Sequence, residues 1–218
     1  MMSFKVAALQ IAVIAAGMFF CGLTESANAR TIRIVGLGDS LMAGYQLPPG
    51  DGFPAKLEAA LKARGIDVVI ADAGVSGDTT SGGLSRADWS VPDGTDGVIL
   101  ELGANDALRG IPPEESENNL DAIIGRLSAR NIPVLLAGML APPNMGADYA
   151  SRFNPIYKRL ADKYDLTLYP FFLDGVAAQA RLQLADGMHP NSQGVDVMVQ
   201  RFQPVVEGFI ATIGAKLK

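Results

Sequence analysis

The chain has 218 residues, of which 49% are hydrophobic and 19% are charged, and its formal net charge at pH 7 is −5. This length and apolar content suit a single globular domain with a sizeable buried core. Lysine and arginine form no cluster or stripe along the chain. The composition therefore argues against a nucleic-acid-binding protein.

Residues 1–29 differ from the rest of the chain. Lys5 is followed by the apolar run VAALQIAVIAAGMFFCGL, and the segment ends in Ala27–Ala29, where two small residues flank an asparagine. A positive start, an apolar centre and such an ending are typical of a secretory signal peptide. We therefore expect residues 1–29 to be a signal peptide and residues 30–218 to form one domain, periplasmic or secreted. The alternative is that the apolar run is retained as a membrane anchor, since it is long enough to span a bilayer.

Cleavage of the N-terminal segment would remove the only cysteine of the chain. Cys21 is the only cysteine and lies within the apolar run. If the segment is removed, the mature protein has no disulfide, no cysteine nucleophile and no thiolate metal ligand.

Beyond Arg30, short apolar runs rich in β-branched residues alternate with amphipathic segments. The apolar runs are typical of strands buried on both faces, and the amphipathic segments of helices. In chain order we expect a strand over 31–37, a helix over 53–64, strands over 67–71 and 97–102, a helix over 114–130, a strand over 133–137, a helix over 151–164, a strand over 166–169 and a helix over 191–217. This alternation predicts an α/β protein: a three-layer α/β/α sandwich around a roughly five-stranded parallel sheet, flavodoxin-like.

Compact polar motifs follow four of the five expected strands. They are Gly38–Ser40 after the first, Ser76–Asp78 after the second, Gly103–Asp106 after the third, and Asp186 with His189 beyond the fifth. In an open parallel sheet, functional groups gather at the carboxyl ends of the strands. We therefore expect these motifs to converge at one edge of the sheet.

His189 is the only histidine of the chain. Asp186 precedes it by three residues, so its carboxylate can bind one imidazole nitrogen, fix the tautomer and leave the other nitrogen free as a base. A lone histidine is otherwise often structural, and the nearby aspartate favours a catalytic role. A single histidine also excludes a multi-histidine metal site, and we expect no cofactor.

Ser40 has two interpretations. Serine after Gly-Asp at a helix start is a common N-cap, and its hydroxyl becomes a good nucleophile only when a base accepts its proton. The expected position of Ser40 at the same sheet edge as His189 favours the nucleophile. Three donors for an oxyanion are available there, unless they are simply turn residues. They are the backbone N–H groups of Ser40 and Gly77 and the side-chain amide of Asn105.

Four motifs in order carry a resemblance to a known family. They are GDSL at 38–41, SGD at 76–78, GAND at 103–106 and DGMH at 186–189. Together they resemble the GDSL or SGNH serine hydrolases, and the similarity covers nearly all of the chain after the N-terminal segment. Further stretches, among them SGDTTSGGLSR and YPFFLDGVAAQ, are similar to the bacterial periplasmic thioesterase, lysophospholipase and arylesterase branch.

The resemblance implies a catalytic triad of Ser40, Asp186 and His189, with Ser40, Gly77 and Asn105 as oxyanion donors. It implies a serine esterase that hydrolyses carboxylic ester or thioester bonds through an acyl-enzyme on Ser40. Substrates would be aryl esters, short to medium acyl esters, acyl-CoA or lysophospholipid. The family often has glycine where this chain has Ala104, which affects the backbone beside Asn105 rather than the chemistry.

An apolar loop over residues 140–153 is expected to line the acyl groove, although its side chains could equally only pack the rim. The candidate substrate-binding residues, which include neighbours of two site motifs, are Leu108, Ile111, Pro142, Pro143, Met145, Tyr149 and Met188.

Two alternatives remain open. A carbohydrate or peptidoglycan O-acetyl esterase would favour a more polar cleft with exposed aromatic residues, and Trp89 is the only tryptophan. A non-catalytic periplasmic binding protein would not need a serine, a histidine and an aspartate at separate strand ends. The expected partners are a small-molecule ester or thioester and, transiently, membrane lipid; no nucleic acid is expected, and the protein is expected to be a monomer.

Overall fold

The computed structural model describes residues 30–216, so the expected signal peptide lies outside the described residues. Five strands form one sheet in the order β2-β1-β3-β4-β5, and every neighbouring pair is parallel. The strands are β1 Ile32–Gly38, β2 Val68–Gly74, β3 Gly97–Glu101, β4 Val134–Ala137 and β5 Thr167–Tyr169. This strand order is that of a flavodoxin-like doubly wound sheet, in which ligands bind at the carboxyl ends of the strands near the point where the order reverses.

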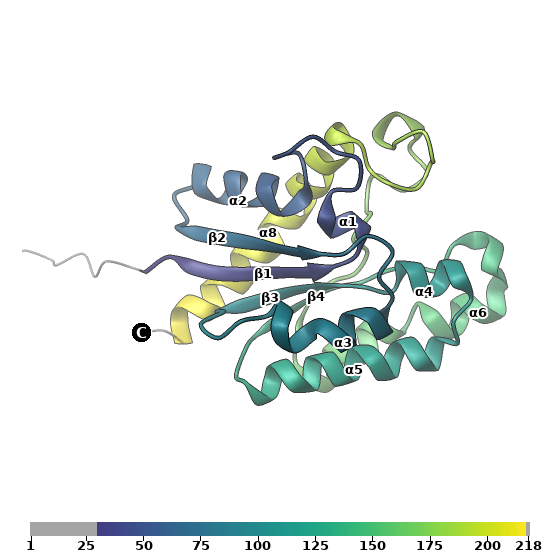
Figure 1. Cartoon of the computed structure of the whole chain (residues 1–218), viewed down its shortest axis with the longest axis horizontal. Coiled ribbons are helices and arrows are strands. Elements are labelled where there is room, and N and C mark those ends of the chain that lie inside the picture. Colours follow the sequence, from purple (N-terminus) through teal and green to yellow (C-terminus); the bar gives the residue numbers. More distant parts are fainter. Residues whose placement is uncertain (1–29, 217–218) are drawn as a thin grey trace, which may run out of the picture.

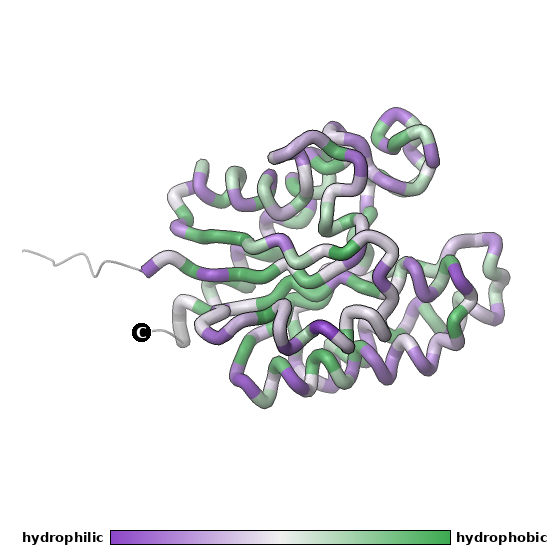
Figure 2. The backbone as a smooth tube through the Cα atoms, in the orientation of Figure 1, coloured by the Kyte–Doolittle hydropathy of each residue, from purple (hydrophilic) through white to green (hydrophobic). Residues whose placement is uncertain are grey.

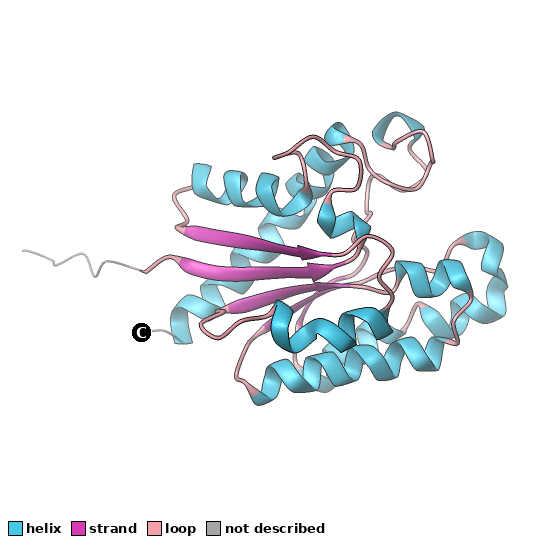
Figure 3. Ribbon diagram, in the orientation of Figure 1, coloured by secondary structure: helices cyan, strands magenta, loops and turns pink. Residues whose placement is uncertain are grey.

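Helices cover both faces of the sheet (Figure 1, Figure 3). Helices α2 and α8 pack on each other over one face, and α3, α5 and α7 cover the other. The helices are α1 Ser40–Ala43, α2 Phe53–Ala63, α3 Thr80–Ser90, α4 Ala104–Arg109, α5 Pro113–Ala129, α6 Gly146–Phe153, α7 Ile156–Tyr164 and α8 Ser192–Lys216, with 3-10 turns η1 at Pro143–Met145 and η2 at Ala180–Leu182. The predicted three-layer α/β/α sandwich with a parallel sheet is confirmed. None of the helices within residues 30–216 has the length and apolar character needed to cross a membrane.

Burial of the strands depends on their position in the sheet. Every residue of β3 and β4 is buried, as are the last five of β1, so these three strands agree with the expectation. The expectation is wrong for β2 and β5, which are edge strands. In β2, Val69 is 44% exposed. An edge strand lacks a neighbouring strand on one side, which leaves part of it open to solvent.

One predicted helix, over residues 151–164, is wrong in its bounds and continuity. The structure has α6 and α7 in its place, separated at Asn154 and Pro155. Proline has no N–H to continue the helical ladder and clashes with the preceding turn. The side chain of Asn154 uses the break to accept a hydrogen bond of 2.8 Å from the N–H of Ala141. Helices α1, α3 and α4 were not among the predicted elements, because they are short or rich in glycine and serine.

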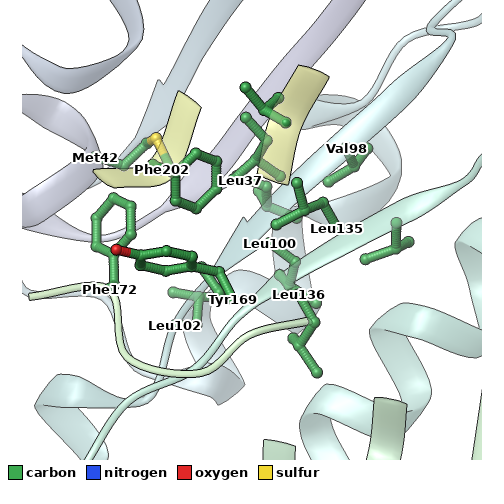
Figure 4. Packing of buried hydrophobic residues seen from close by; sticks show 14 of the residues in the cluster. Leu37, Met42, Val98, Leu100, Leu102, Leu135, Leu136, Tyr169, Phe172 and Phe202 are labelled. Atoms are coloured by element: carbon green, nitrogen blue, oxygen red, sulfur yellow. The ribbon is translucent and has the colours of Figure 1, made fainter. Parts of the chain in front are cut away.

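An aromatic cluster joins the two helices over one face to the sheet, and Figure 4 shows its rings of Tyr169, Phe172 and Phe202. The ring centroids of Phe53 and Phe172 are 4.7 Å apart, those of Phe53 and Phe202 are 5.2 Å apart, and those of Tyr169 and Phe202 are 4.8 Å apart. These edge-to-face or tilted contacts are the favoured geometry for aromatic rings. Figure 2 shows the strands as largely hydrophobic segments between helices of mixed character. The core therefore fixes the strand ends from which the site loops project.

Candidate active site

The turn between β1 and α1 presents Ser40. Asp39 is the N-cap of α1, because its Oδ1 accepts the N–H of Leu41 at 3.0 Å. Ser40 is the first residue of the helix, where backbone N–H groups have no partner within the helix. The alternative that Ser40 itself is the N-cap is therefore excluded, and both its hydroxyl and its N–H remain available.

A chain of hydrogen bonds joins Ser40 to His189 and Asp186. The Oγ of Ser40 is 2.8 Å from Nε2 of His189, and Nδ1 of His189 is 2.7 Å from Oδ2 of Asp186. A carboxylate can only accept, so the proton between His189 and Asp186 belongs to Nδ1. Nε2 is then the acceptor for the hydroxyl proton of Ser40.

The loop before α8 holds Asp186 in its ionised form. Its Oδ1 accepts the backbone N–H groups of Met188 at 2.9 Å and His189 at 3.0 Å. These backbone bonds, aided by the imidazole, lower the pKa of Asp186 to about 2. The loop itself is closed by the N–H of Leu184 donating to the carbonyl of His189 at 2.8 Å, and by Gly187 in a left-handed conformation with φ of 69°. The partner of His189 is therefore negatively charged across the working pH range of most enzymes.

Two further groups face the same edge from the loops after β2 and β3. Gly77 has φ of 84°, a conformation that side chains with a Cβ rarely adopt. Asn105, in the first turn of α4, donates its Nδ2 hydrogens to Oδ2 of Asp39 at 3.0 Å and to the carbonyl of Asp78 at 2.9 Å. The structure thus brings the predicted Gly77 and Asn105 to the edge at which the turn presents Ser40. The amide of Asn105 is already oriented by two acceptors.

Beneath Ser40 lies a pair of fully buried carboxyl groups, Asp39 and Glu101. Oε2 of Glu101 accepts the N–H of Asp39 at 3.2 Å, whereas Oε1 is buried without a hydrogen-bond partner among residues 30–216. Burial raises the pKa of Asp39 to about 6. Burial, together with the neighbouring Asp39 charge, raises the pKa of Glu101 well above its usual range. Burial therefore disfavours the charged form of both carboxyl groups.

Arg86 of α3 joins the loops that carry these groups. It is 5% exposed and donates to the carbonyls of Gly38 at 2.8 Å and Ala73 at 2.7 Å. Its Nε also bonds Oδ2 of Asp78 at 2.6 Å. One guanidinium thus connects the ends of β1 and β2 with the loop that contains Gly77. Its five donors in a fixed fork suit it to this arrangement.

Asp106 connects α4 to its neighbouring helices in a similar way. It is fully buried and accepts the N–H of Thr80 at 2.8 Å and the hydroxyl of Ser116 at 3.0 Å. These bonds connect the starts of α3, α4 and α5, and they hold the neighbouring Asn105 in place. Sequence analysis missed Glu101, Arg86 and Asp106 as site-supporting residues. The one signal for Asp106 was its place in the GAND motif.

The candidate groove residues fall into three groups: exposed, half-buried and buried. Leu108 and Met188 are both 49% exposed, and Pro143 is exposed at the start of η1. Pro142, Met145 and Ile111 are half-buried. Tyr149 is buried, stacks on Phe153 with a centroid distance of 5.7 Å and donates its hydroxyl to the carbonyl of Ile111 at 2.8 Å. Tyr149 therefore holds the loop after α4, while Leu108 and Met188 present free apolar surface.

A serine, a histidine and an aspartate in one hydrogen-bonded chain, at the carboxyl edge of a flavodoxin-like sheet, define a hydrolase of the three-layer α/β/α class. The chain belongs to the GDSL-like lipase/acylhydrolase family, whose model matches residues 37–197. The family predicted from the four motifs is confirmed.

Individual relatives agree with this membership. The chain is 36% identical over 195 residues to an arylesterase of Vibrio mimicus, covering 89% of this chain and 92% of the relative. It is 34% identical over 194 residues to the thioesterase 1/protease 1/lysophospholipase L1 of Escherichia coli strain K12, covering 87% and 91%. Among solved structures, the SGNH-hydrolase family esterase AlinE4 is 47% identical with a TM-score of 0.70, covering 82% of this chain and 96% of that one. The protein is therefore an enzyme of the ester-hydrolysing kind.

Proposed function

We propose that the protein hydrolyses carboxylic esters and thioesters through an acyl-enzyme on Ser40. The observation that carries the proposal is the hydrogen-bonded chain from Ser40 through His189 to Asp186, with links of 2.8 Å and 2.7 Å. A serine hydroxyl needs such a base before it can attack a carbonyl at a useful rate.

The mechanism follows from these atoms. Nε2 of His189 takes the proton of Ser40 as Oγ forms a bond to the substrate carbonyl carbon, which gives a tetrahedral intermediate. The imidazolium then returns the proton to the leaving alcohol or thiol as the carbon–oxygen or carbon–sulfur bond breaks. Water repeats both steps, releasing the carboxylic acid and free Ser40. Asp186 orients the imidazole and stabilises its positive charge without itself taking a proton.

The negative oxygen of the intermediate is bound by the N–H groups of Ser40 and Gly77 and by the amide of Asn105. In the free enzyme the amide of Asn105 donates to Asp39 and to the carbonyl of Asp78. A charged oxyanion is a stronger acceptor than a neutral carbonyl, so it competes with Asp78 for this donor. This interaction forms fully only in the transition state, which is where it lowers the barrier.

The preferred substrates are esters with apolar acyl or aryl groups. Exposed Leu108 of α4 lies at the site edge of the sheet, as do Leu140 and Met188 of the loops there. Such surface favours an acyl chain or an aromatic ring over a sugar. The names of the arylesterase and lysophospholipase relatives agree with this preference.

Export is a separate part of the proposal. The charged start, apolar centre and small-residue ending of residues 1–29 support cleavage after Ala29 and release into the periplasm. Mass spectrometry of the protein from a periplasmic fraction should give a chain that begins at Arg30. A chain that retains Met1 would contradict cleavage.

A fluorophosphonate probe tests the nucleophile. The wild-type protein should be labelled once, Ser40→Ala should not be labelled, and Ser85→Ala, which removes an exposed serine of α3, should be labelled like the wild type. Labelling that survives Ser40→Ala would overturn the proposal. Relative kcat/KM on p-nitrophenyl acetate, a long-chain p-nitrophenyl ester, an acyl-CoA, a lysophospholipid and an O-acetylated glycan then ranks the substrates. A preference for the glycan would replace the proposed class with the O-acetyl esterase.

A further inference from the structure

The ring of Tyr45 packs on the imidazole of His189, with centroids 4.5 Å apart and planes inclined by 39°. The acyl-transfer steps described above make no use of this residue. We propose that Tyr45 is a positioning residue, whose aromatic face supports the imidazole and the imidazolium that forms during proton transfer. The inference rests on the proposed function, since it assigns a role at the same base.

The local fold explains how Tyr45 reaches this place. Helix α1 has only four residues and ends at Gly44, which has a left-handed φ of 67°. A Cβ on Gly44 would lie 2.9 Å from Cα of Gly52, so a side chain is not accommodated there. The turn directs the next N–H, that of Tyr45, back to the carbonyl of Ser40 at 3.1 Å. Tyr45 is thus anchored to the backbone of the nucleophile itself.

This anchoring complements the other constraints on His189. Its hydrogen bonds to Ser40 and Asp186 run through Nε2 and Nδ1, both in the plane of the ring. Bonds in the plane fix the direction of the two nitrogens but restrain tilting of the ring only weakly. A side chain packed against the face of the ring supplies the missing restraint. Because Tyr45 is tied to Ser40, it aligns the base with the nucleophile and not merely with the loop before α8.

The chemistry adds an electrostatic reason. His189 becomes a cation in each half of the reaction, and a cation over an aromatic face within about 6 Å of its centroid is attracted by the electrons of the ring. The hydroxyl of Tyr45 points elsewhere, since it accepts a hydrogen bond of 3.0 Å from Nε2 of Gln46. The ring is therefore the part of Tyr45 that should matter, and phenylalanine should replace it.

Steady-state kinetics of two variants test the inference on a p-nitrophenyl ester. Tyr45→Leu should lower kcat by about five- to thirtyfold, which corresponds to about 1–2 kcal/mol in the upper part of the cation–π range, with KM changed by less than about twofold. Tyr45→Phe should stay within about twofold of the wild type in both constants. Trp89→Leu is the matched control, because it removes an aromatic ring that is 73% exposed on α3.

A spectroscopic measurement checks the packing separately. His189 is the only histidine of the chain, so an untagged protein has one set of imidazole carbon-bound proton signals in its NMR spectrum. The ring of Tyr45 should displace these signals through its ring current. The displacement should persist in Tyr45→Phe and disappear in Tyr45→Leu. If Tyr45→Leu does not give a native circular-dichroism spectrum, Tyr45→Met is measured in its place, because its flexible side chain fills irregular space.

Several results would overturn the inference. They are a wild-type kcat for Tyr45→Leu, an effect of Tyr45→Leu confined to KM, or a loss in Tyr45→Phe as large as in Tyr45→Leu. Failure of the proposed function looks different, because the wild-type protein would then neither react with the fluorophosphonate nor turn over any ester, and the role of Tyr45 would fall with it. A labelled, active wild type with an equally active Tyr45→Leu variant rejects only the role of Tyr45.

Discussion

Two aspartates lie close to His189 and the turn that presents Ser40, and their pKa values move in opposite directions. Asp186 is partly exposed and accepts two backbone N–H groups, which lowers its pKa to about 2. Asp39 is fully buried, and desolvation raises its pKa to about 6 despite its bond to the N–H of Leu41. Asp186 therefore supplies a permanent negative charge to His189, whereas Asp39 is a titratable hydrogen-bond acceptor for Asn105.

Asp186→Asn should lower kcat on the order of 10³- to 10⁴-fold with little change in fold. The amide that replaces the carboxylate cannot accept from Nδ1 in both orientations and does not stabilise the imidazolium. Esterase assays with purified protein measure this loss. Asp162→Asn, an exposed residue of α7 that bonds Lys158, makes the same change of charge and should keep full activity. Activity of Asp186→Asn within tenfold of the wild type would contradict the proposed mechanism.

Asn105→Ala should lower kcat by about 10²- to 10³-fold while KM changes little, as for the loss of an oxyanion donor elsewhere. The amide acts on the intermediate more than on the bound ester, so the rate and not the binding should respond. Asn131→Gly, at the amino end of the sheet, provides the comparison, because Asn131 has a φ of 56° that glycine adopts without strain. An increase in KM at unchanged kcat would identify Asn105 as a binding residue instead.

At the scale of elements, the site depends on how closely short helices approach the strand ends. Helix α1 begins directly after β1, and its Met42 packs beside Gly36 and Gly38. A Cβ on Gly38 would lie 2.6 Å from both Oε2 of Glu101 and Cβ of Met42. The turn that presents Ser40 therefore has no room for a larger residue before Asp39.

Gly38→Ala should reduce the free energy of unfolding by about 1–3 kcal/mol, the usual cost of overpacking, and should also reduce activity because Ser40 is displaced. Urea unfolding monitored by circular dichroism measures the first effect. Gly208→Ala in α8 is the control: no atom lies within 4 Å of its added Cβ. The free energy of unfolding of Gly208→Ala should rise by about 0.5–1 kcal/mol, because alanine has the higher helix propensity. Equal stability of the two variants would show that the space at Gly38 is not limiting.

At the scale of the whole molecule, the buried pair of Asp39 and Glu101 couples stability to pH. Both folded-state pKa values are raised, to about 6 for Asp39 and well above the usual range for Glu101. The folded protein then binds more protons than the unfolded chain. The stabilisation is complete below the unfolded pKa values and is lost as pH rises through the folded ones. The buried pair beneath Ser40 therefore lowers the free energy of unfolding as pH rises.

Glu101→Gln should be more stable than the wild type at alkaline pH and closely similar to it at pH 4. Glutamine has the shape of the neutral acid and can still accept the N–H of Asp39, but it has no proton to lose. Thermal unfolding across this pH range measures the difference, with Glu115→Gln, an exposed residue of α5, as the control. A stability difference between Glu101→Gln and the wild type that stays constant with pH would contradict titration of Glu101.

The positions of Ser40, Gly77, Asn105 and His189 at one edge could be predicted because parallel strands all end on the same side. That inference needed only the strand pattern and the polar motif after each strand. Glu101 could not be recognised in this way, because it lies in an apolar run where the pattern indicates only a strand. Arg86 acts through contacts with Gly38 and Ala73 of other elements, which no local pattern specifies.

The break at Pro155 was present in the sequence, yet the apolar period on both sides predicted a continuous helix. The contact between Tyr45 and His189 could not be predicted for a related reason. Its partner His189 comes from the opposite end of the chain, so neither residue signals the other locally. Spacing thus predicted which groups lie together at the edge of the sheet, whereas the groups that hold them required the packed structure.

The hydrogen bond between Ser40 and His189 joins residues separated by 149 positions. Ser40 directly follows β1 and its partner His189 lies beyond β5, so this hydrogen bond connects the two ends of the β1–β5 segment of the fold. Any nascent or truncated chain that stops before residue 189 therefore carries a serine without its base. Under the proposed mechanism, ester turnover therefore reports that the segment from β1 to the loop before α8 has closed correctly.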